Sequence, residues 1–516
     1  MSNPSIKHAL TVTREADFPA WYQAVIAEAE MAEDSGVRGC MVIRPWGYGI
    51  WERIQALMDA RIKAAGVDNC YFPLFIPLSY FAKEAEHVEG FAKEMAVVTH
   101  HRLVGDGKGG LMPDPEAKLE EPLIVRPTSE TVIGQAMSRW IQSWRDLPLL
   151  TNQWANVVRW EMRTRMFLRT SEFLWQEGHT AHATRDDAMA ETLRALEMYR
   201  QVAEDDLAIP VVVGEKPENE RFPGAVATYS IEAMMQDGKA LQAGTSHYLG
   251  TGFAEAANIR YQDKEGSQAL CHTTSWGVST RMIGGLIMVH GDDDGLRVPP
   301  QVAPHQVVIL PMLRDNDGDE VLLAYCEALR AEIAAQSAFG ERVRVLLDKR
   351  PGKATQKRWA WVKKGVPLVL EIGGRDADGG QVSVIRRDRL WNLDNGKVAF
   401  VAEPRAAFVA RVAAELVDIQ ASLHADARAR LDGGITRGLT DLAGLAAHFA
   451  ESEANPGWVE IAWSRPTGAA LDKVVETLKA LKLTIRNAPL DAAPAEGICP
   501  FTGAPAVERI LVARAY

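Results

Sequence analysis

The segment from Val157 to His179 carries the densest set of side chains suited to chemistry. Successive side chains of a strand point to opposite faces, so Arg159 and Glu161 share one face of a first predicted strand. One face of a second predicted strand carries Phe173, Trp175, Glu177 and His179. Guanidinium groups hold phosphate and carboxylate through paired hydrogen bonds, and an aromatic ring can stack on a base. The pattern favours a pocket floor for an anionic ligand; the alternative is an exposed, salt-bridged sheet.

A second group of candidate residues alternates along residues 275–281. Ser275, Gly277, Ser279 and Arg281 share one face, and the small residues let a flat ligand approach the backbone. Arg281 stands where a strand gives way to a helix, and a cation is unfavourable at a helix N-terminus. This placement indicates an anionic partner, and an ordinary surface arginine is the alternative.

Two shorter motifs could recognise a small molecule. Thr128, Ser129 and Glu130 open a predicted helix. They can be its N-cap and first turn, or Glu130 can bind an ammonium group at a pocket mouth. A turn of small residues is surrounded by Gln242, Thr245 and His247. Neutral donors and acceptors of this kind suit small-molecule recognition, although a histidine buried in the core is the alternative.

Three other features have plainer interpretations. The chain has no GxxxxGK[ST] loop, and we interpret the glycine cluster 105–110 as a flexible loop, so any nucleotide must be held by other means. Asp292–Asp294 could bind a cation, but we predict a solvated hinge. Residues 341–390 hold thirteen Lys and Arg against six Asp and Glu. That surplus indicates either a solvated face or a polyanion-binding module.

Composition excludes several classes of protein. The apolar fraction of 47% and the charged fraction of 24% are those of a globular chain. A net charge of −11 argues against nonspecific coating of nucleic acid. No apolar run approaches the ~20 residues of a membrane helix, and residues 1–15 predict no signal peptide. The five cysteines lie far apart, without a CxxC pair, which argues against disulfide and zinc frameworks and favours the cytosol.

The length of 516 residues predicts about three domains. Helical spacing is clear over Trp46–Ile62, and a β-type run follows at residues 70–77, whose prolines place it at an edge. Three prolines in residues 298–304 predict a linker. Alternating strands and helices in residues 305–404 predict an α/β domain. Residues 405–516 then predict a long helix and a small α+β module.

Taken together, these motifs resemble the class II aminoacyl-tRNA synthetases, and within them the prolyl family of the archaeal/eukaryote-like type without an inserted editing domain. Arg159-x-Glu161 with Arg169, Phe173 and Glu177 resembles the second class motif, and Gly277–Arg281 resembles the third. The helix at 46–62 and the strand ending at Pro77 resemble the first, which in this class forms a homodimer interface. The resemblance implies an α+β catalytic domain on an antiparallel sheet over residues 1–297, then an α/β anticodon-binding domain and a zinc-module-like C-terminal domain.

The resemblance also implies an activity: ATP and Mg²⁺ convert L-proline to a prolyl-adenylate with release of pyrophosphate, and the prolyl group passes to the terminal adenosine of tRNA(Pro). Arg159 would hold the α-phosphate and the proline carboxylate. The other implied ATP contacts are Glu161, Arg169, Thr170, Phe173, Gln242, Thr245 and Arg281. The other implied proline contacts are Thr128, Glu130, Trp175, His179 and His247. The implied anticodon-binding candidates are Arg350, Lys353, Lys364, Glu371 and Arg375.

Two departures from the family pattern stand out. Glu177 and Gly277 are only 100 residues apart, too close for a large editing insertion. Family relatives often carry four zinc-binding cysteines in the C-terminal module, where this chain has only Cys499, so we predict no zinc. The terminal Tyr516 resembles a family tail that packs near the active site.

Two other hypotheses remain. A non-enzymatic paralogue would be expected to lose the motif arginines, all of which stand here. A threonyl or glycyl sibling is the other, and a threonyl site would need a Cys/His zinc set, for which only Cys271 is near the third motif.

Overall fold

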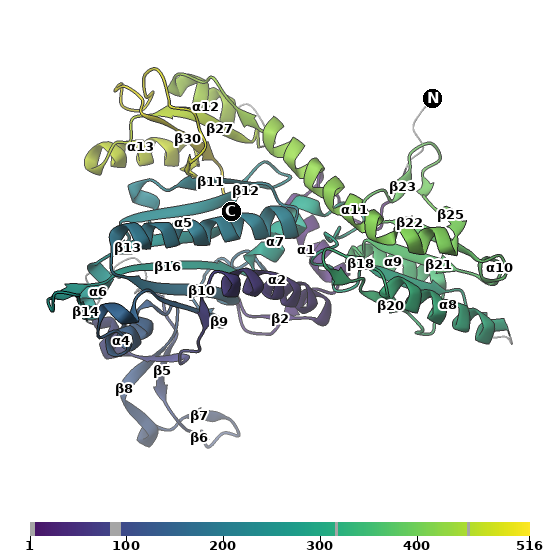
Figure 1. Ribbon diagram of the computed structural model, residues 1–516, viewed down its shortest axis with the longest axis horizontal. Helices are drawn as coiled ribbons and strands as arrows, with labels where there is room; N and C mark the ends of the chain where they lie inside the picture. Colours follow the sequence, from purple (N-terminus) through teal and green to yellow (C-terminus); the bar gives the residue numbers. More distant parts are fainter. Residues whose placement is uncertain (1–5, 83–93, 315–317, 451–454) are drawn as a thin grey trace.

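The computed structural model describes residues 6–82, 94–314, 318–450 and 455–516. A large antiparallel sheet forms its centre, an α/β domain lies at one end, and a small third domain sits over one edge of the sheet (Figure 1). The predicted fold class is therefore confirmed. None of the described helices has the length and apolar character needed to cross a membrane.

The central sheet has eight strands. In spatial order they are β29 (Ala488–Pro489), β11 (Val211–Glu215), β12 (Ala227–Met234), β13 (Ala240–Gly250), β16 (His272–Ser279), β10 (Glu172–His182), β9 (Leu149–Val158) and β3 (Asp68–Asn69). Only β3 and β9 run parallel. The order is not sequential, and the C-terminal β29 supplies one edge.

Helices cover one face of this sheet. Helices α5 (Arg185–Gln201) and α7 (Arg281–His290) pack on it with α1 (Phe18–Glu28) and α2 (Pro45–Ala64), and their apolar side chains share one core with Ile231, Leu241 and Val278. Gly178 is required there, because a Cβ at this position would lie 2.2 Å from the Trp276 ring. The opposite face carries the polar side chains of the candidate site.

The predicted helix 46–62 is α2, whose buried positions include Ile50, Ile54 and Met58. The predicted strand 70–77 is shorter than expected. Only β4 (Phe75–Pro77) forms, as an edge strand beside β8 (Lys118–Val125), with β5 (Val97–His100) on the far side of β8. Proline lacks the N–H that a ladder needs, which limits pairing around Pro73 and Pro77.

Short elements complete the first domain. They are β1 (Ala32–Asp34), β2 (Met41–Ile43), α3 (Leu78–Ala82), β6 (Leu103–Gly105), β7 (Leu111–Pro113), η1 (Pro115–Ala117), α4 (Glu130–Trp140), η2 (Trp144–Asp146), η3 (Val202–Asp206), η4 (Glu218–Glu220), α6 (Gly252–Ala256), β14 (Arg260–Gln262) and β15 (Gln268–Leu270). The glycine cluster 105–110 lies in the β6–β7 connection.

The second domain is a five-stranded mixed sheet with helices. Its order is β20 (Val345–Leu347), β17 (Val307–Pro311), β21 (Leu368–Ile372), β22 (Gln381–Arg386) and β25 (Val401–Pro404). Its other elements are α8 (Gly318–Ala334), β18 (Ser337–Ala338), β19 (Glu341–Arg342), α9 (Ala354–Lys364), α10 (Gly374–Asp378), β23 (Trp391–Asn392) and β24 (Lys397–Val398). The proline segment 298–304 that precedes it is mostly buried, so it is packed rather than a loose tether.

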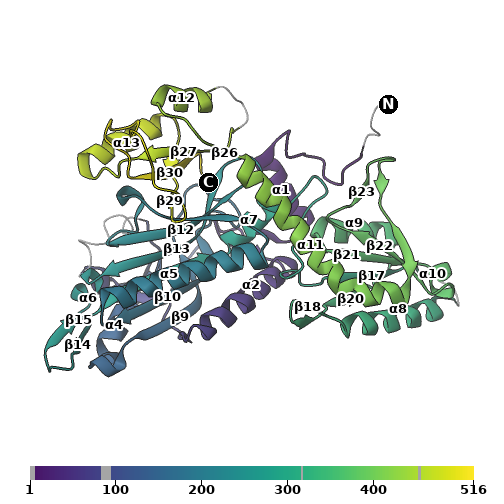
Figure 2. The same cartoon turned by 45° about the horizontal axis from the view of Figure 1, so that its top comes forward.

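A helix of 29 residues, α11 (Arg405–Gly433), runs from the second domain to the third (Figure 2). Its first half packs Phe408, Val412 and Leu416 into the core of the second domain. The boundary predicted at 404/405 therefore falls before a helix that still belongs to that core.

The third domain has a four-stranded sheet of β26 (Ile435–Thr436), β27 (Trp458–Trp463), β30 (Glu508–Ala513) and β28 (Thr484–Ile485), with α12 (Leu442–Ala450) and α13 (Gly468–Ala480).

Candidate functional site

The free face of the large sheet carries the site, and strand register places its side chains in rows. One row joins Gln153, Glu177, Gly277 and Thr245 across four strands. The next joins Thr151, His179, Ser275, His247 and Thr228. Directly paired residues point to the same side of a sheet. The predicted face of β10, with Phe173, Trp175, Glu177 and His179, is thus confirmed and extended by β16 and β13.

A β-bulge brings one more residue to this face. Along β13, the register shifts so that Ile231 pairs with Gly244 while Glu232 pairs with Gln242. The bulge leaves Ala243 without a partner in this register. Strict alternation would put Gln242 and Thr245 on opposite faces, but a bulge re-aims the strand. Both residues consequently line the same pocket.

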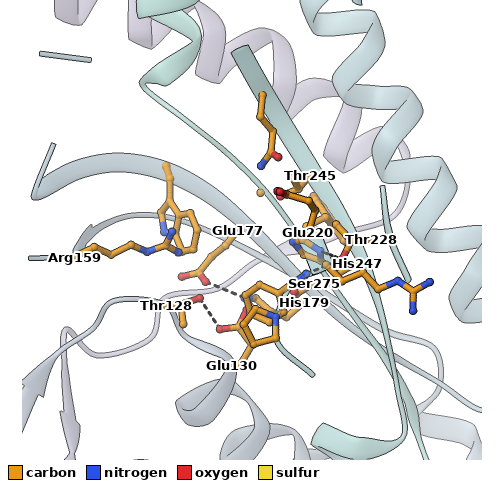
Figure 3. A pocket seen from close by; sticks show the side chains of 17 residues that line it. Thr128, Glu130, Arg159, Glu177, His179, Glu220, Thr228, Thr245, His247 and Ser275 are labelled. Carbon is orange, nitrogen blue, oxygen red and sulfur yellow. Dashed lines mark hydrogen bonds and ion pairs between the residues drawn. The ribbon is translucent and has the colours of Figure 1, made fainter. Parts of the chain in front are cut away.

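The first pocket encloses about 240 Å³ and is drawn in Figure 3. Its lining includes all of the predicted proline contacts: Thr128, Glu130, Arg159, Trp175, His179 and His247. Gln242 and Thr245, predicted to contact ATP, line this pocket as well. No cysteine is among its lining residues, and Cys271 lies buried in a separate apolar cluster.

Two of the carboxylates that line this pocket, those of Glu130 and Glu177, accept hydrogen bonds from neighbouring hydroxyls. Thr128 donates its hydroxyl hydrogen to Glu130. Ser129 stands at the N-cap of α4, but its hydroxyl makes no capping bond and instead donates to Glu177 Oε1 at 2.6 Å. Ser129 therefore occupies the predicted N-cap position, but its side chain does not cap the helix. Both hydroxyls orient carboxylates at the pocket rather than serving the helix.

His179 and Glu177 form a buried pair, with 2.9 Å between His179 Nε2 and Glu177 Oε2. Burial opposes both charges, yet the hydrogen bond and mutual attraction prevail, so the pKa of His179 is raised and that of Glu177 is lowered. His247 behaves oppositely. Burial, aided by His179 and Arg159, lowers the pKa of His247 to about 3, so it is neutral at pH 7.

Residues from a loop that sequence patterns did not highlight close the first pocket. Glu220, Arg221, Phe222 and Pro223 line it. The Phe222 ring lies 4.8 Å from that of His247, and Thr228 Oγ1 lies 3.0 Å from His247 Nδ1. The segment 216–224 looked like an ordinary connecting loop. Three further lining residues, Glu177, Ser275 and Gly277, are indicated by the sequence through the alternating faces of β10 and β16.

A second pocket of about 370 Å³ adjoins the first. Its lining includes Arg159, Glu161, Arg169, Thr170, Phe173 and Arg281, all predicted ATP contacts, together with Glu94. Strand β9 ends at Val158, so Arg159 and Glu161 lie just after it. The prediction that these two residues lie within the strand is therefore wrong. The connection between β9 and β10 is rich in arginine, with Arg159, Arg163, Arg165 and Arg169.

Arginines dominate this second pocket. Arg281 donates from Nε to the Leu168 carbonyl at 3.0 Å, which fixes its guanidinium against the 159–171 connection. Burial, followed by repulsion from Arg159 and Arg169, lowers the pKa of Arg281 to about 10. An arginine-rich pocket of this kind is suited to an anionic ligand, because guanidinium groups bind phosphate and carboxylate through charge-assisted hydrogen bonds.

Arg159 lines both pockets. Its Nε donates to the Pro127 carbonyl at 2.9 Å. Its guanidinium carbon lies 5.6 Å from the Phe173 ring centre and 5.3 Å from that of Trp175. These contacts hold one cation at the junction, where it can contact anionic groups of two ligands at once.

The anticodon-binding candidates are placed differently from one another. Arg350 is 62% exposed at its side chain and pairs with Asp348 at 2.7 Å. Lys353 is exposed at the N-cap of α9. Glu371 is buried and pairs with Arg358 at 3.2 Å.

The other two differ again. Arg375 is exposed in α10. Lys364 pairs with Glu30 of the first domain, so it serves a contact between domains.

The acidic run Asp292–Asp294 is not the predicted solvated hinge. Asp292 binds Arg387 of the second domain through two hydrogen bonds. Asp293 accepts from Arg14, and Asp294 accepts from the Trp391 indole at 2.7 Å. Two of these carboxylates instead tie the first domain to the second, and Asp293 binds Arg14 within the first domain.

The third domain contacts the first through its tail as well as its strands. Tyr516 donates its backbone N–H to the Ala240 carbonyl at 3.1 Å and its hydroxyl to Asp237. Its ring lies 5.6 Å from the guanidinium carbon of Arg165, which belongs to the connection beside the second pocket. Cys499 is buried, and no group of three or more metal-ligating side chains occurs within the described ranges.

Comparisons with known proteins match this architecture. The family described as "tRNA synthetase class II core domain (G, H, P, S and T)" matches residues 115–290. The family described as "Anticodon binding domain" matches residues 306–400.

Three curated relatives named proline–tRNA ligase match along the whole chain. That of Novosphingobium aromaticivorans is 77% identical over 100% of both chains. That of Sphingopyxis alaskensis is 73% identical over 100% of this chain and 97% of the relative. That of Erythrobacter litoralis is 69% identical over 100% of both.

Proposed function

This chain belongs to the proline–tRNA ligases, a family of class II synthetases, and from this we propose how its two pockets share one reaction. The enzyme attaches L-proline to its tRNA at the expense of ATP. The observation that carries our assignment is the position of Arg159 on the wall common to both pockets. Proline would lie in the first pocket and ATP in the second, with the reacting groups meeting at Arg159.

The chemistry suits this arrangement. The proline carboxylate attacks the α-phosphorus of ATP, the bond to pyrophosphate breaks, and prolyl-adenylate forms. The nucleophile is already an anion, so no side chain has to remove a proton. Fixed geometry and positive charge on the phosphates are what the protein must supply. A hydroxyl of the tRNA terminal adenosine then attacks the carbonyl carbon, and AMP leaves.

The first pocket matches a cyclic imino acid. Glu130, oriented by Thr128, would accept from the secondary ammonium of proline. His247 is neutral and stacks near Phe222, which supports an apolar wall for the ring. Arg159 would bind the carboxylate at the opposite end.

The second pocket matches ATP. Phe173 would stack on the adenine, Glu161 would contact its edge, and Arg169 and Arg281 would hold the phosphates, with Thr170 beside them. Gln242 and Thr245 line the first pocket, so we propose that they contact ATP where it meets proline.

We also propose that Mg²⁺ assists. The oxygen ligands that this ion prefers are offered in the second pocket by Glu94 and Glu161. When bound with ATP, Mg²⁺ would neutralise phosphate charge. The three arginines perform the rest of that task within the chain itself.

Other assignments stay proposals. We propose that residues 1–297 are the catalytic domain, 298–304 the linker, 305–404 the anticodon-binding domain and 405–516 the C-terminal domain. Among the anticodon candidates Arg350, Lys353 and Arg375 are the most accessible. Most of residues 177–277 lie in strands and helices of the large sheet and its surroundings, which supports the type without an inserted editing domain. A homodimer through α2 and a cytoplasmic location complete the proposal.

The test is ATP–pyrophosphate exchange by the full chain with each amino acid in turn. Proline alone should stimulate exchange. Exchange with threonine or glycine instead of proline, or with no amino acid, would contradict the assignment of the first pocket. The aminoacylation of proline tRNA by the same preparation tests the second step.

A further inference from the structure

The third domain contributes one strand to the large sheet of the first domain. After β28 the chain leaves the four-stranded sheet of the third domain, and β29 then pairs with β11 of the large sheet. Asn487 donates to the Val212 carbonyl at 3.1 Å. Gly214 makes this approach possible, because a Cβ there would lie 2.5 Å from the Ala488 carbonyl oxygen. The segment entering β29 is therefore built into the catalytic sheet.

Arg486, just before β29, reaches a buried carboxylate of the first domain. Its Nη2 lies 2.8 Å from Glu232 Oε2, and Lys216 Nζ lies 2.8 Å from Glu232 Oε1. The side chains of Lys216, Glu232 and Arg486 are exposed by 1%, 0% and 8%. Two cations and one anion are thus enclosed together, with one positive charge in excess.

The register shows which face this cluster occupies. Glu232 pairs with Gln242, directly at the bulge, while Ser230 pairs with Thr245. Paired side chains share a face and stand about 5 Å apart. The cluster of Lys216, Glu232 and Arg486 therefore lies on the ligand-binding face, beside the residues that line the first pocket.

The same cluster acts electrostatically on the second pocket. Arg281 lies within the field of both Glu232 and Arg486. Arg159 and Arg169 add further positive charge around Arg281. The third domain thus supplies the cation that offsets the buried negative charge of Glu232.

We propose that Arg486 is a positioning residue for ATP. It holds Glu232 beneath the bulge that presents Gln242, and it offsets the negative charge that Glu232 would otherwise bring to this wall. The proposal rests on the assignment of ATP to the second pocket. It gives the third domain a part in adenylate formation although that domain keeps only one of its cysteines.

The test compares Arg486→Met with the wild-type full chain in proline-dependent ATP–pyrophosphate exchange. Loss of the cation that offsets Glu232 should raise the KM for ATP about tenfold. The KM for proline and kcat should stay within about twofold. Arg486→Lys, which restores the charge, should return the KM for ATP to within about threefold of wild type. If the role of Arg486 were purely structural, Arg486→Met would instead lower the thermal midpoint of unfolding and leave the KM for ATP unchanged.

Arg465→Met is the matched control. Arg465 also joins the third domain to the first, at 2.9 Å from Glu215, but its side chain is 49% exposed. Its loss should leave the KM for ATP unchanged. A wild-type KM for ATP in folded Arg486→Met, or an equal rise in both variants, overturns the proposal. If Arg486→Met does not fold, Arg486→Gln, which can still donate to Glu232, takes its place with the same expectation. Absence of exchange in the wild type would instead refute the proposed function.

Discussion

Arg387 of the second domain and Asp292 of the first form a two-bond ion pair, with 2.8 Å between Nη1 and Oδ2 and 2.5 Å between Nη2 and Oδ1. The Arg387 side chain is 2% exposed. Asp292 follows the end of α7, and Arg281 is the first residue of that helix. One short helix therefore connects an ATP-pocket arginine with the contact between domains.

Arg387→Met should loosen this contact. Removing one partner of a buried pair leaves the other charge without compensation. Because Asp292 keeps partial exposure, we expect a loss of about 2 kcal/mol in the free energy of unfolding. Aminoacylation of tRNA should fall more than pyrophosphate exchange, since exchange needs only the first domain's pockets. Urea unfolding and the two assays measure these effects. Arg389→Met is the control, because Arg389 is 62% exposed; an equal loss in both variants would contradict the prediction.

Arg159→Ala should abolish most adenylate formation. Arg159 lines both pockets, and loss of one preorganised group that stabilises transition-state charge costs about 10²–10³ in rate. Exchange should fall by at least about 100-fold, while the circular dichroism spectrum stays unchanged. Arg163→Ala, an exposed arginine of the same connection, should exchange normally. Activity of Arg159→Ala near the wild-type level would count against the shared-wall assignment.

Glu130→Gln should weaken proline binding selectively. The carboxylate is matched to the secondary ammonium of proline, and hydrogen bonds to charged groups contribute about 1.5–3 kcal/mol. The KM for proline should rise at least about tenfold, and the KM for ATP should change little. Glu120→Gln, on the exposed side of β8, is the control. A rise in the KM for ATP without a rise in the KM for proline would contradict the assignment of Glu130 to proline binding.

The His179–Glu177 pair should make stability depend on pH. The pKa of His179 is raised in the folded state and that of Glu177 is lowered. The histidine's contribution is complete below its unfolded pKa of about 6.5, and it is lost as pH rises through the raised folded value. The glutamate's contribution is lost on acidification below about pH 4.5. Unfolding of wild type and His179→Asn should therefore differ most near pH 5–6. A difference that grows above pH 8 would exclude the charged pair.

Sequence patterns predicted those parts of the site in which functional side chains recur with the two-residue period of a strand. The face of β10 could be predicted because alternation alone places Phe173, Trp175, Glu177 and His179 together. Arg281 could be placed at the start of a helix because the small residues before it end a strand. These inferences need only neighbours along the chain.

Other features depend on contacts between distant segments. The bulge at Ala243 is decided by pairing with β12, and no local signal marks it. The Phe222 loop gains its role only by lying against His247. The aspartates at 292–294 resembled a solvated hinge because their arginine and tryptophan partners are far away in sequence.

The late position of β29 in the chain has a consequence for biosynthesis. A ribosome releases the nascent polypeptide from its N-terminus, so early domains generally fold first. Strand β11 has emerged long before residues 488–489, which will cover its outer edge. An uncovered edge strand is a template for unwanted association between chains. The nascent chain must therefore pass through a stage in which the outer edge of β11 is open to association, until residues 488–489 have been synthesised.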